Sequence, residues 1–122
     1  MATGYNIKTV KLLDGQTTST ASPGTAAQGT LGGWFMIGKF LSPTATIQGV
    51  GAGDTISIRV SNNDEWTPPL PSDNGVPHNT LGSVTSDSGG GLGGAFTWIK
   101  ATKVDGGTHT STNVYLQMQI AK

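Results

Sequence analysis

The run at residues 113–120 alternates between polar and apolar side chains, and this alternation constrains the fold more than any other feature of the chain. Its apolar members are Val114, Leu116, Met118 and Ile120. A period of two places them on one face of a β-strand. A second apolar run, at residues 96–104, is separated from the first by Asp105-Gly106-Gly107, whose glycines can adopt the positive φ of a tight turn. We therefore predict that the two runs pair as a hairpin.

Apolar runs of strand length recur along the rest of the chain, whereas no helical period persists for three turns. We predict strands at residues 5–13, 34–41, 45–50, 55–61 and 78–84. Prolines predict a stiff, irregular loop at residues 66–77, and the glycine-rich residues 86–94 predict a flexible surface loop. Seven to eight short strands separated by turns indicate an all-β protein, with an antiparallel β-sandwich or jelly-roll-like fold.

Length and composition exclude several classes of protein. The 122 residues fit one domain, and the absence of cysteine excludes a disulfide framework or a thiolate metal site. Seven basic and seven acidic residues cancel, so we expect neither a nucleic acid nor a membrane as partner. Residues 1–10 lack the apolar segment of a secretory signal, and no apolar stretch is long enough to span a bilayer. We expect a soluble protein, made in the cytoplasm of the producing cell without export.

Residues 14–33 are rich in Thr, Ser, Ala and Gly and show no sustained period. A connection of this length is unusual inside a compact domain. We interpret the segment as a mobile loop or, in preference, as an extended polar arm that becomes ordered only against a partner.

The predicted strand at residues 34–41 is apolar on both faces. Trp34, Met36 and Phe40 lie on one face, and Phe35, Ile37 and Leu41 on the other. One set must fill the core, while the other must meet the flank of the opposite sheet, the arm or a neighbouring subunit, because large exposed apolar side chains are costly. We therefore predict that at least one of the six lies at a subunit contact.

Side chains that could support catalysis or metal binding are few and scattered. Asp64 and Glu65 are adjacent in a turn, where carboxylates splay apart, unlike the opposed pair of a glycosidase. His78 and His109 have no further ligands at a zinc-binding spacing. The glycine run at residues 89–94 lacks the Lys-Ser/Thr of a phosphate loop. We predict no enzymatic activity, no metal and no cofactor.

Trp66 differs from the other two tryptophans. Trp34 and Trp98 lie within predicted strands, where a position in the core or at an interface is expected, whereas Trp66 lies at the start of the proline-rich loop and is the best candidate for an exposed ring. An exposed ring could stack on a sugar. A carbohydrate-binding or host-recognition module that uses Trp66 is therefore an alternative function.

Three segments resemble small β-sandwich structural proteins of tailed bacteriophages. KLLDGQTTSTASPGTAAQGTLGGWFMIGKF, at residues 11–40, resembles their opening strand, linker and Gly-Trp strand. TATIQGVGAGDTISIRVSNNDEW, at residues 44–66, is similar to their hairpin, with Asn63-Asp64-Glu65-Trp66 in place of Asp-Gly-x-Trp and without its glycine. FTWIKATKVDGGTHTSTNVYLQMQ, at residues 96–119, resembles their closing hairpin.

The resemblance implies a non-enzymatic virion protein of the capsid decoration (cement) kind. The implied partners are the major capsid protein and further copies of the chain, and the symmetry axes of an icosahedral shell favour a homotrimer. The candidate interface residues are Trp34, Phe35, Met36, Ile37, Phe40, Leu41 and Trp66. A tail or baseplate sandwich domain is a further alternative.

Overall fold

A computed structural model describes residues 6–20 and 33–120 of the protein. Within these ranges the chain forms eight strands: β1 (Asn6–Gln16), β2 (Phe35–Met36), β3 (Leu41–Gln48), β4 (Thr55–Ser61), β5 (Val76–Pro77), β6 (Ser88–Gly91), β7 (Trp98–Val104) and β8 (Thr112–Ile120). No helix long and apolar enough to cross a membrane occurs among the described residues.

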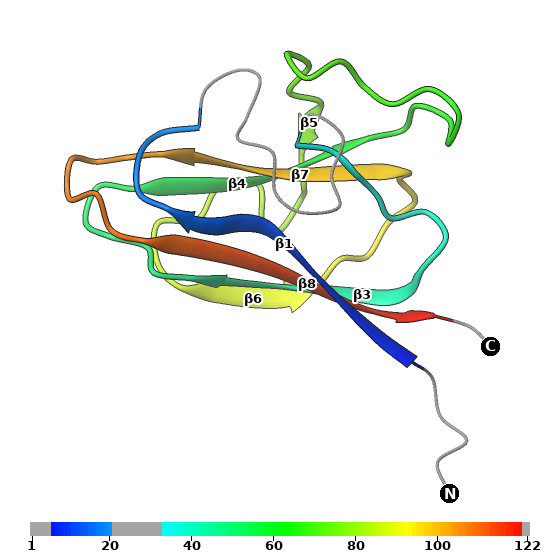
Figure 1. Ribbon diagram of the computed structural model, residues 1–122, viewed down its shortest axis with the longest axis horizontal. Coiled ribbons are helices and arrows are strands. Elements are labelled where there is room, and N and C mark those ends of the chain that lie inside the picture. The colour runs from blue at the N-terminus through cyan, green and yellow to red at the C-terminus, as the bar shows by residue number, and fades with distance from the viewer. Residues whose placement is uncertain (1–5, 21–32, 121–122) are drawn as a thin grey trace, which may run out of the picture.

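The strands form two antiparallel sheets of four strands each, stacked as the layers of a sandwich (Figure 1). The first sheet has the strand order β1-β8-β3-β6, and the second has the order β2-β7-β4-β5. The predicted all-β class and antiparallel sandwich are therefore confirmed. Asn6 lies opposite Ile120, so the two ends of the described chain leave the domain from neighbouring strands.

The core lies between the sheets and is built from alternate residues of the long strands. In β8, Val114, Leu116 and Met118 are buried in the core, whereas the polar residues between them face outward. Ile56 and Ile58 of β4 are buried from the opposite sheet. Burying each such side chain stabilises the fold by roughly 1.5–3 kcal/mol, so the alternation fixes which face of each strand points inward.

The predicted hairpin between residues 96–104 and 113–120 is wrong, because β7 and β8 belong to different sheets. The connection at residues 105–111 crosses from one sheet to the other and packs on the connection between β3 and β4. Gly106 permits this packing, since a Cβ there would lie 2.4 Å from the carbonyl carbon of Gly53. Gly106 therefore marks the close approach of two loops and not a hairpin turn.

The predicted strand at residues 34–41 is also wrong for most of its length, because Phe35–Met36 forms the short strand β2 and Leu41 already belongs to the next strand, β3. Gly38 and Lys39 form a turn, in which the backbone N–H of Phe40 donates to the carbonyl oxygen of Ile37 (3.0 Å). After this turn the chain enters β3 at Leu41.

The turn changes where the six apolar side chains of this segment lie. Phe35 and Ile37 join the core, and Phe40 stacks on Phe35 with 5.6 Å between ring centroids. Trp34 is buried outside the core cluster, Met36 is half-buried and Leu41 is exposed. The subunit contact assigned to this group stays a prediction, but the regular strand on which it was based is absent.

Two further segments differ from expectation. The predicted loop at residues 86–94 contains β6, which pairs with Thr44–Ile47 of β3, because main-chain pairing needs no side chains. The predicted strand at residues 78–84 consists instead of turns and irregular backbone, with a single bridge from Val84 to Ile56. The neighbouring β5 pairs with β4 at the edge of the second sheet, where a proline can be tolerated.

The predicted arm at residues 14–33 begins later than expected. Residues 14–16 are the end of β1, and the residues that follow lie along β7. The backbone N–H of Thr20 donates to the carbonyl oxygen of Lys103 (2.9 Å), and the hydroxyl of Ser19 accepts from the N–H of Asp105 (2.8 Å). Residues 21–32, which make up most of the predicted arm, lie outside the described residues.

Candidate interaction surface

The proline loop, residues 62–75, connects β4 to β5 and covers the outer face of the second sheet. Its first part is fixed by Trp98, whose indole N–H donates to the carbonyl oxygen of Asp64 (3.0 Å). The carboxylate of Asp64 caps the turn by accepting from the N–H of Trp66 (2.9 Å). The main-chain carbonyl oxygen of Asp64 also accepts from the N–H of Thr67 (3.1 Å). The turn that carries Trp66 is therefore held in one conformation.

The second part of the proline loop is fixed by two cationic side chains from the sheet below. The ammonium group of Lys100 donates to the carbonyl oxygen of Asp73 (2.7 Å), and the guanidinium of Arg59 donates to that of Asn74. Lys100 also lies 4.8 Å from the ring centroid of Trp34. Hydrogen bonds from charged donors are stronger than neutral ones, so the loop is tied to the sheet near both of its ends.

Lys100 is a buried cation on the outer face of β7, where alternation with the core residues Ile99 and Ala101 places it. Burial lowers its pKa below the usual value, Asp73 opposes this shift by its negative charge, and Arg59 adds to it by its positive charge. The ring of Trp34 shares this space. A Cβ on Gly75 would lie 2.8 Å from that ring, which shows how tightly the loop packs over it.

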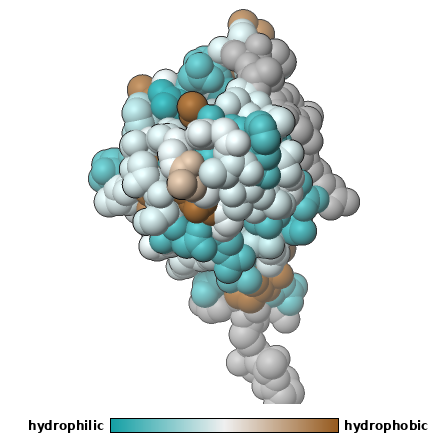
Figure 2. All heavy atoms as spheres, turned by 90° about the vertical axis from the view of Figure 1, so that its left-hand side faces the viewer, coloured by the Kyte–Doolittle hydropathy of each residue, from teal (hydrophilic) through white to brown (hydrophobic). Residues whose placement is uncertain are grey.

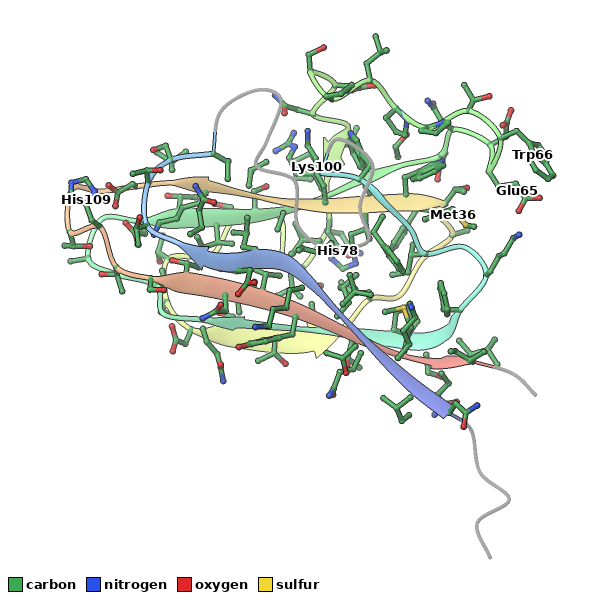
Figure 3. The ribbon with its side chains drawn as sticks, viewed as in Figure 1. Met36, Glu65, Trp66, His78, Lys100 and His109 are labelled. Carbon is green, nitrogen blue, oxygen red and sulfur yellow. The ribbon has the colours of Figure 1, made fainter. Side chains whose placement is uncertain are left out.

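The outer side of this fixed loop carries large apolar side chains that face solvent. Trp66 is 83% exposed, Leu70 is 70% exposed, and Val76 of the adjoining β5 is 60% exposed. Figure 3 shows Trp66 at the extremity of the loop, with its ring directed away from both sheets. The predicted exposure of Trp66 is confirmed, and Trp34 and Trp98 are buried within the chain.

A surface hollow of about 410 Å³ lies close to this loop. We call it the Phe40–Phe96 hollow; Ile37, Phe40, Pro43, Leu92, Ala95 and Phe96 supply its apolar lining, and Asn62 of the proline loop supplies an amide. A smaller hollow of about 180 Å³ adjoins it and shares Asn62, Ala95 and Phe96 with it. Lys39, next to Phe40, forms an ion pair with Glu65, next to Trp66 (3.5 Å).

The opposite end of the sandwich holds a buried ion pair between Asp54 and Lys103, with 3.5 Å between carboxylate oxygen and ammonium nitrogen. Lys103 also donates to the carbonyl oxygens of Gln16 and Thr110 and to the hydroxyl of Thr112. It thereby joins β1, β7 and the strand β8 across the end of the core. Figure 2 shows that the outer surface of this end consists mainly of residues of intermediate hydropathy, with hydrophilic patches and small hydrophobic areas.

The candidate catalytic side chains do not come together. The buried ring of His78 accepts at Nδ1 from the N–H of Leu81 (3.3 Å), while its Nε2 faces the carbonyl oxygen of Gly93 (3.3 Å), so both ring nitrogens have partners within the chain. His109 is exposed at the other end of the sandwich and pairs with Asp105 (2.6 Å; Figure 3). Within residues 6–20 and 33–120, no cluster of three or more His, Asp or Glu side chains could hold a metal ion.

Lys100 and Arg59, which fix the proline loop, and the Asp54–Lys103 pair at the opposite end of the sandwich were not among the residues predicted from sequence. The sequence does contain a signal for Lys103. It lies two residues after Ala101 and four after Ile99 in β7, so its side chain is on the same, inward face of the strand. The sequence contains no such signal for Lys100, since a lysine on the outward face of a strand is ordinarily exposed to solvent.

Comparison with known proteins found no matching family model, no matching curated protein and no matching solved structure.

Proposed function

We propose that this protein is a non-enzymatic structural component of a tailed-phage virion, a capsid decoration protein that binds the assembled head. The observation that carries the proposal is the proline loop with the adjoining β5: the loop presents Trp66 and Leu70 to solvent from a backbone fixed by hydrogen bonds, and β5 presents Val76. Exposed apolar groups on a rigid support are typical of protein-binding surfaces, because little conformational entropy is lost on binding. The sequence resemblance supplies the class of partner.

The proposed partners are the major capsid protein and further copies of this chain, in a homotrimer on the capsid surface. Copies of one chain on an icosahedral shell are related by closed symmetry, which favours a cyclic assembly. The chain carries no net charge, so the binding energy is expected to come from apolar contact and not from electrostatic attraction.

Cryo-electron microscopy of the phage that encodes the chain tests the proposal. Virions with and without the gene should differ by density that covers the outer surface of the head. Density confined to the tail or baseplate would show the tail alternative, and identical particles would refute a virion role.

The role of the proline loop is tested with purified variants added to heads that lack the protein. Leu70→Asp should weaken head binding by at least about 10-fold, because a charge replaces an apolar group in a desolvated contact. Val104→Asp is the matched control, since Val104 is 62% exposed on β7, away from the loop. Equal binding by both variants would show that the proline loop does not contact the head.

The exposure of Trp66 also fits the alternative of a carbohydrate-binding or host-recognition module, because a free indole ring can stack on a sugar. Binding of the protein to an array of glycans, lost in Trp66→Ala and kept in Leu70→Asp, would favour this alternative over capsid binding.

A further inference from the structure

The last two residues of the proline loop, Asn74 and Gly75, form the single Asn-Gly sequence of the chain. Glycine after asparagine favours an intramolecular reaction, because a main-chain nitrogen without an adjacent side chain can approach the amide carbon of the asparagine. Each of the other asparagines is followed by a residue with a side chain, which hinders that approach.

The groups that would react are accessible in the folded protein. The side chain of Asn74 is exposed, and within the described part of the chain its amide has no hydrogen-bond partner. The main-chain N–H of Gly75 donates to the carboxylate of Asp73 (2.8 Å). This distance lies in the range of roughly 2.6–3.2 Å over which a side chain can take up a proton, so an acceptor for the proton of Gly75 is already in place.

The fold itself requires the glycine that makes Asn74 reactive. Gly75 has a φ of +56°, which residues with a side chain rarely adopt. A Cβ at this position would also lie 2.8 Å from the ring of Trp34 and would meet the carbonyl oxygen of Val60. The Asn-Gly sequence therefore lies where packing admits no larger second residue.

We propose that Asn74 is a site of spontaneous deamidation in the folded protein and that the reaction loosens the proline loop. The main-chain nitrogen of Gly75 loses its proton and forms a bond to Cγ of Asn74, and the side-chain nitrogen leaves as ammonia. One water molecule then opens the cyclic imide to give aspartate or isoaspartate. The modification goes beyond the proposed function and does not depend on it, since water is the only co-reactant.

The isoaspartate product changes the main chain where the loop is most tightly held. In this product the chain between residue 74 and Gly75 runs through the former side chain and is one atom longer. Gly75 packs on Trp34, while Arg59 donates to the main-chain carbonyl oxygen of Asn74. An atom added between these two points displaces Gly75 from Trp34 or the loop from Arg59.

Peptide mapping by mass spectrometry tests the modification. The folded protein is kept in mildly alkaline buffer, digested and examined for conversion of the Asn74 amide to an acid, with isoaspartate identified by enzymatic methylation. The rate should rise about tenfold for each unit of pH, because the deprotonated nitrogen is the nucleophile. Asn63 and Asn79, which are also exposed, are internal controls and should stay unchanged. Asn74→Gln keeps an amide but must form a larger ring, so conversion at this position should be lost.

Tryptophan emission tests the effect on the loop. Trp34 is fully buried in the unmodified protein. Displacement of Gly75 should bring its ring into contact with water and shift the emission to longer wavelength, while amide exchange in the loop becomes faster. The incubated Asn74→Gln variant should show neither change. Asn74→Asp, which adds the charge without lengthening the main chain, should keep the emission of the fresh protein.

Three outcomes would overturn the proposal. Asn74 that stays intact in the folded protein but converts in urea would show that the fold protects it. Conversion that is as fast at Asn63 or Asn79 would remove the role of Gly75. Complete conversion at Asn74 with unchanged emission and amide exchange would show that the loop stays in place. Because capsids take no part, head binding can succeed or fail independently of these results.

Discussion

At the scale of single residues, the Asp54–Lys103 pair links stability to pH. The pKa of Asp54 lies below its usual value mainly because the N–H of Gly106 donates to the carboxylate (2.7 Å). Burial opposes this shift, and the N–H of Gly51 and the charge of Lys103 add to it. The ionised carboxylate is therefore favoured in the folded protein.

We predict that this pair makes the protein sensitive to acid. A carboxyl group with a lowered pKa in the folded state stabilises the protein above its unfolded pKa, near 3.8, and this stabilisation is lost as the pH falls through the folded value. The melting temperature should fall below about pH 4, more steeply in the parent than in Asp54→Asn. Asp14→Asn, at an exposed ion pair with Lys11, is the control and should keep the steep parental dependence. Equal slopes in the parent and Asp54→Asn would contradict the assignment.

At the scale of elements, two glycines of this glycine-rich chain, Gly106 and Gly90, are expected to affect stability in opposite directions when replaced by alanine. A Cβ at Gly106 would meet the backbone of the β3–β4 connection at 2.4 Å, whereas a Cβ at Gly90 of β6 would meet nothing within 4 Å. The first glycine is required by packing, and the second is not required by any described contact within the chain.

We predict that Gly106→Ala destabilises the protein and that Gly90→Ala does not. The first change should cost about 1–3 kcal/mol through overpacking, and the second should stabilise by about 0.4–1 kcal/mol, because alanine restricts the unfolded chain. Urea unfolding of both variants measures the difference. A destabilised Gly90→Ala would contradict the prediction, because it would show that the folded state of β6 requires this glycine.

The same elements show what the sequence could predict. Alternation in β4 and β8 identified strands and their buried faces, because burial depends on side chains. It did not identify partners, since a strand buried on one face fits equally well in either sheet. The glycine strand β6 and the hydrogen bonds from Lys100 to the proline loop were missed, because both depend on main-chain groups that are the same in every residue.

At the scale of the whole molecule, the chain passes repeatedly from one sheet to the other. Among the described strands, β4 and β5 are consecutive partners, and every other pair joins strands that are distant in the sequence. During folding such a chain must bring distant segments together, at a cost in entropy, before the contacts between them can stabilise it.

We predict that the domain folds slowly and as one unit. Refolding should take milliseconds to seconds, as in other sandwiches dominated by non-local pairing. Equilibrium unfolding in urea should give coincident transitions by tryptophan emission, whose change reports Trp34 and Trp98, and by far-ultraviolet circular dichroism, which reports both sheets. Separate midpoints would show that one sheet survives without the other.

The pairing of Asn6 with Ile120 has a practical consequence for engineering. The described chain enters the domain on β1 and leaves it on the adjacent β8 (Figure 1). The domain can therefore be inserted into an exposed loop of another protein without separating the two ends of that loop. In such a graft the end of the sandwich shown in Figure 2 would lie opposite Asn6 and Ile120 and stay accessible.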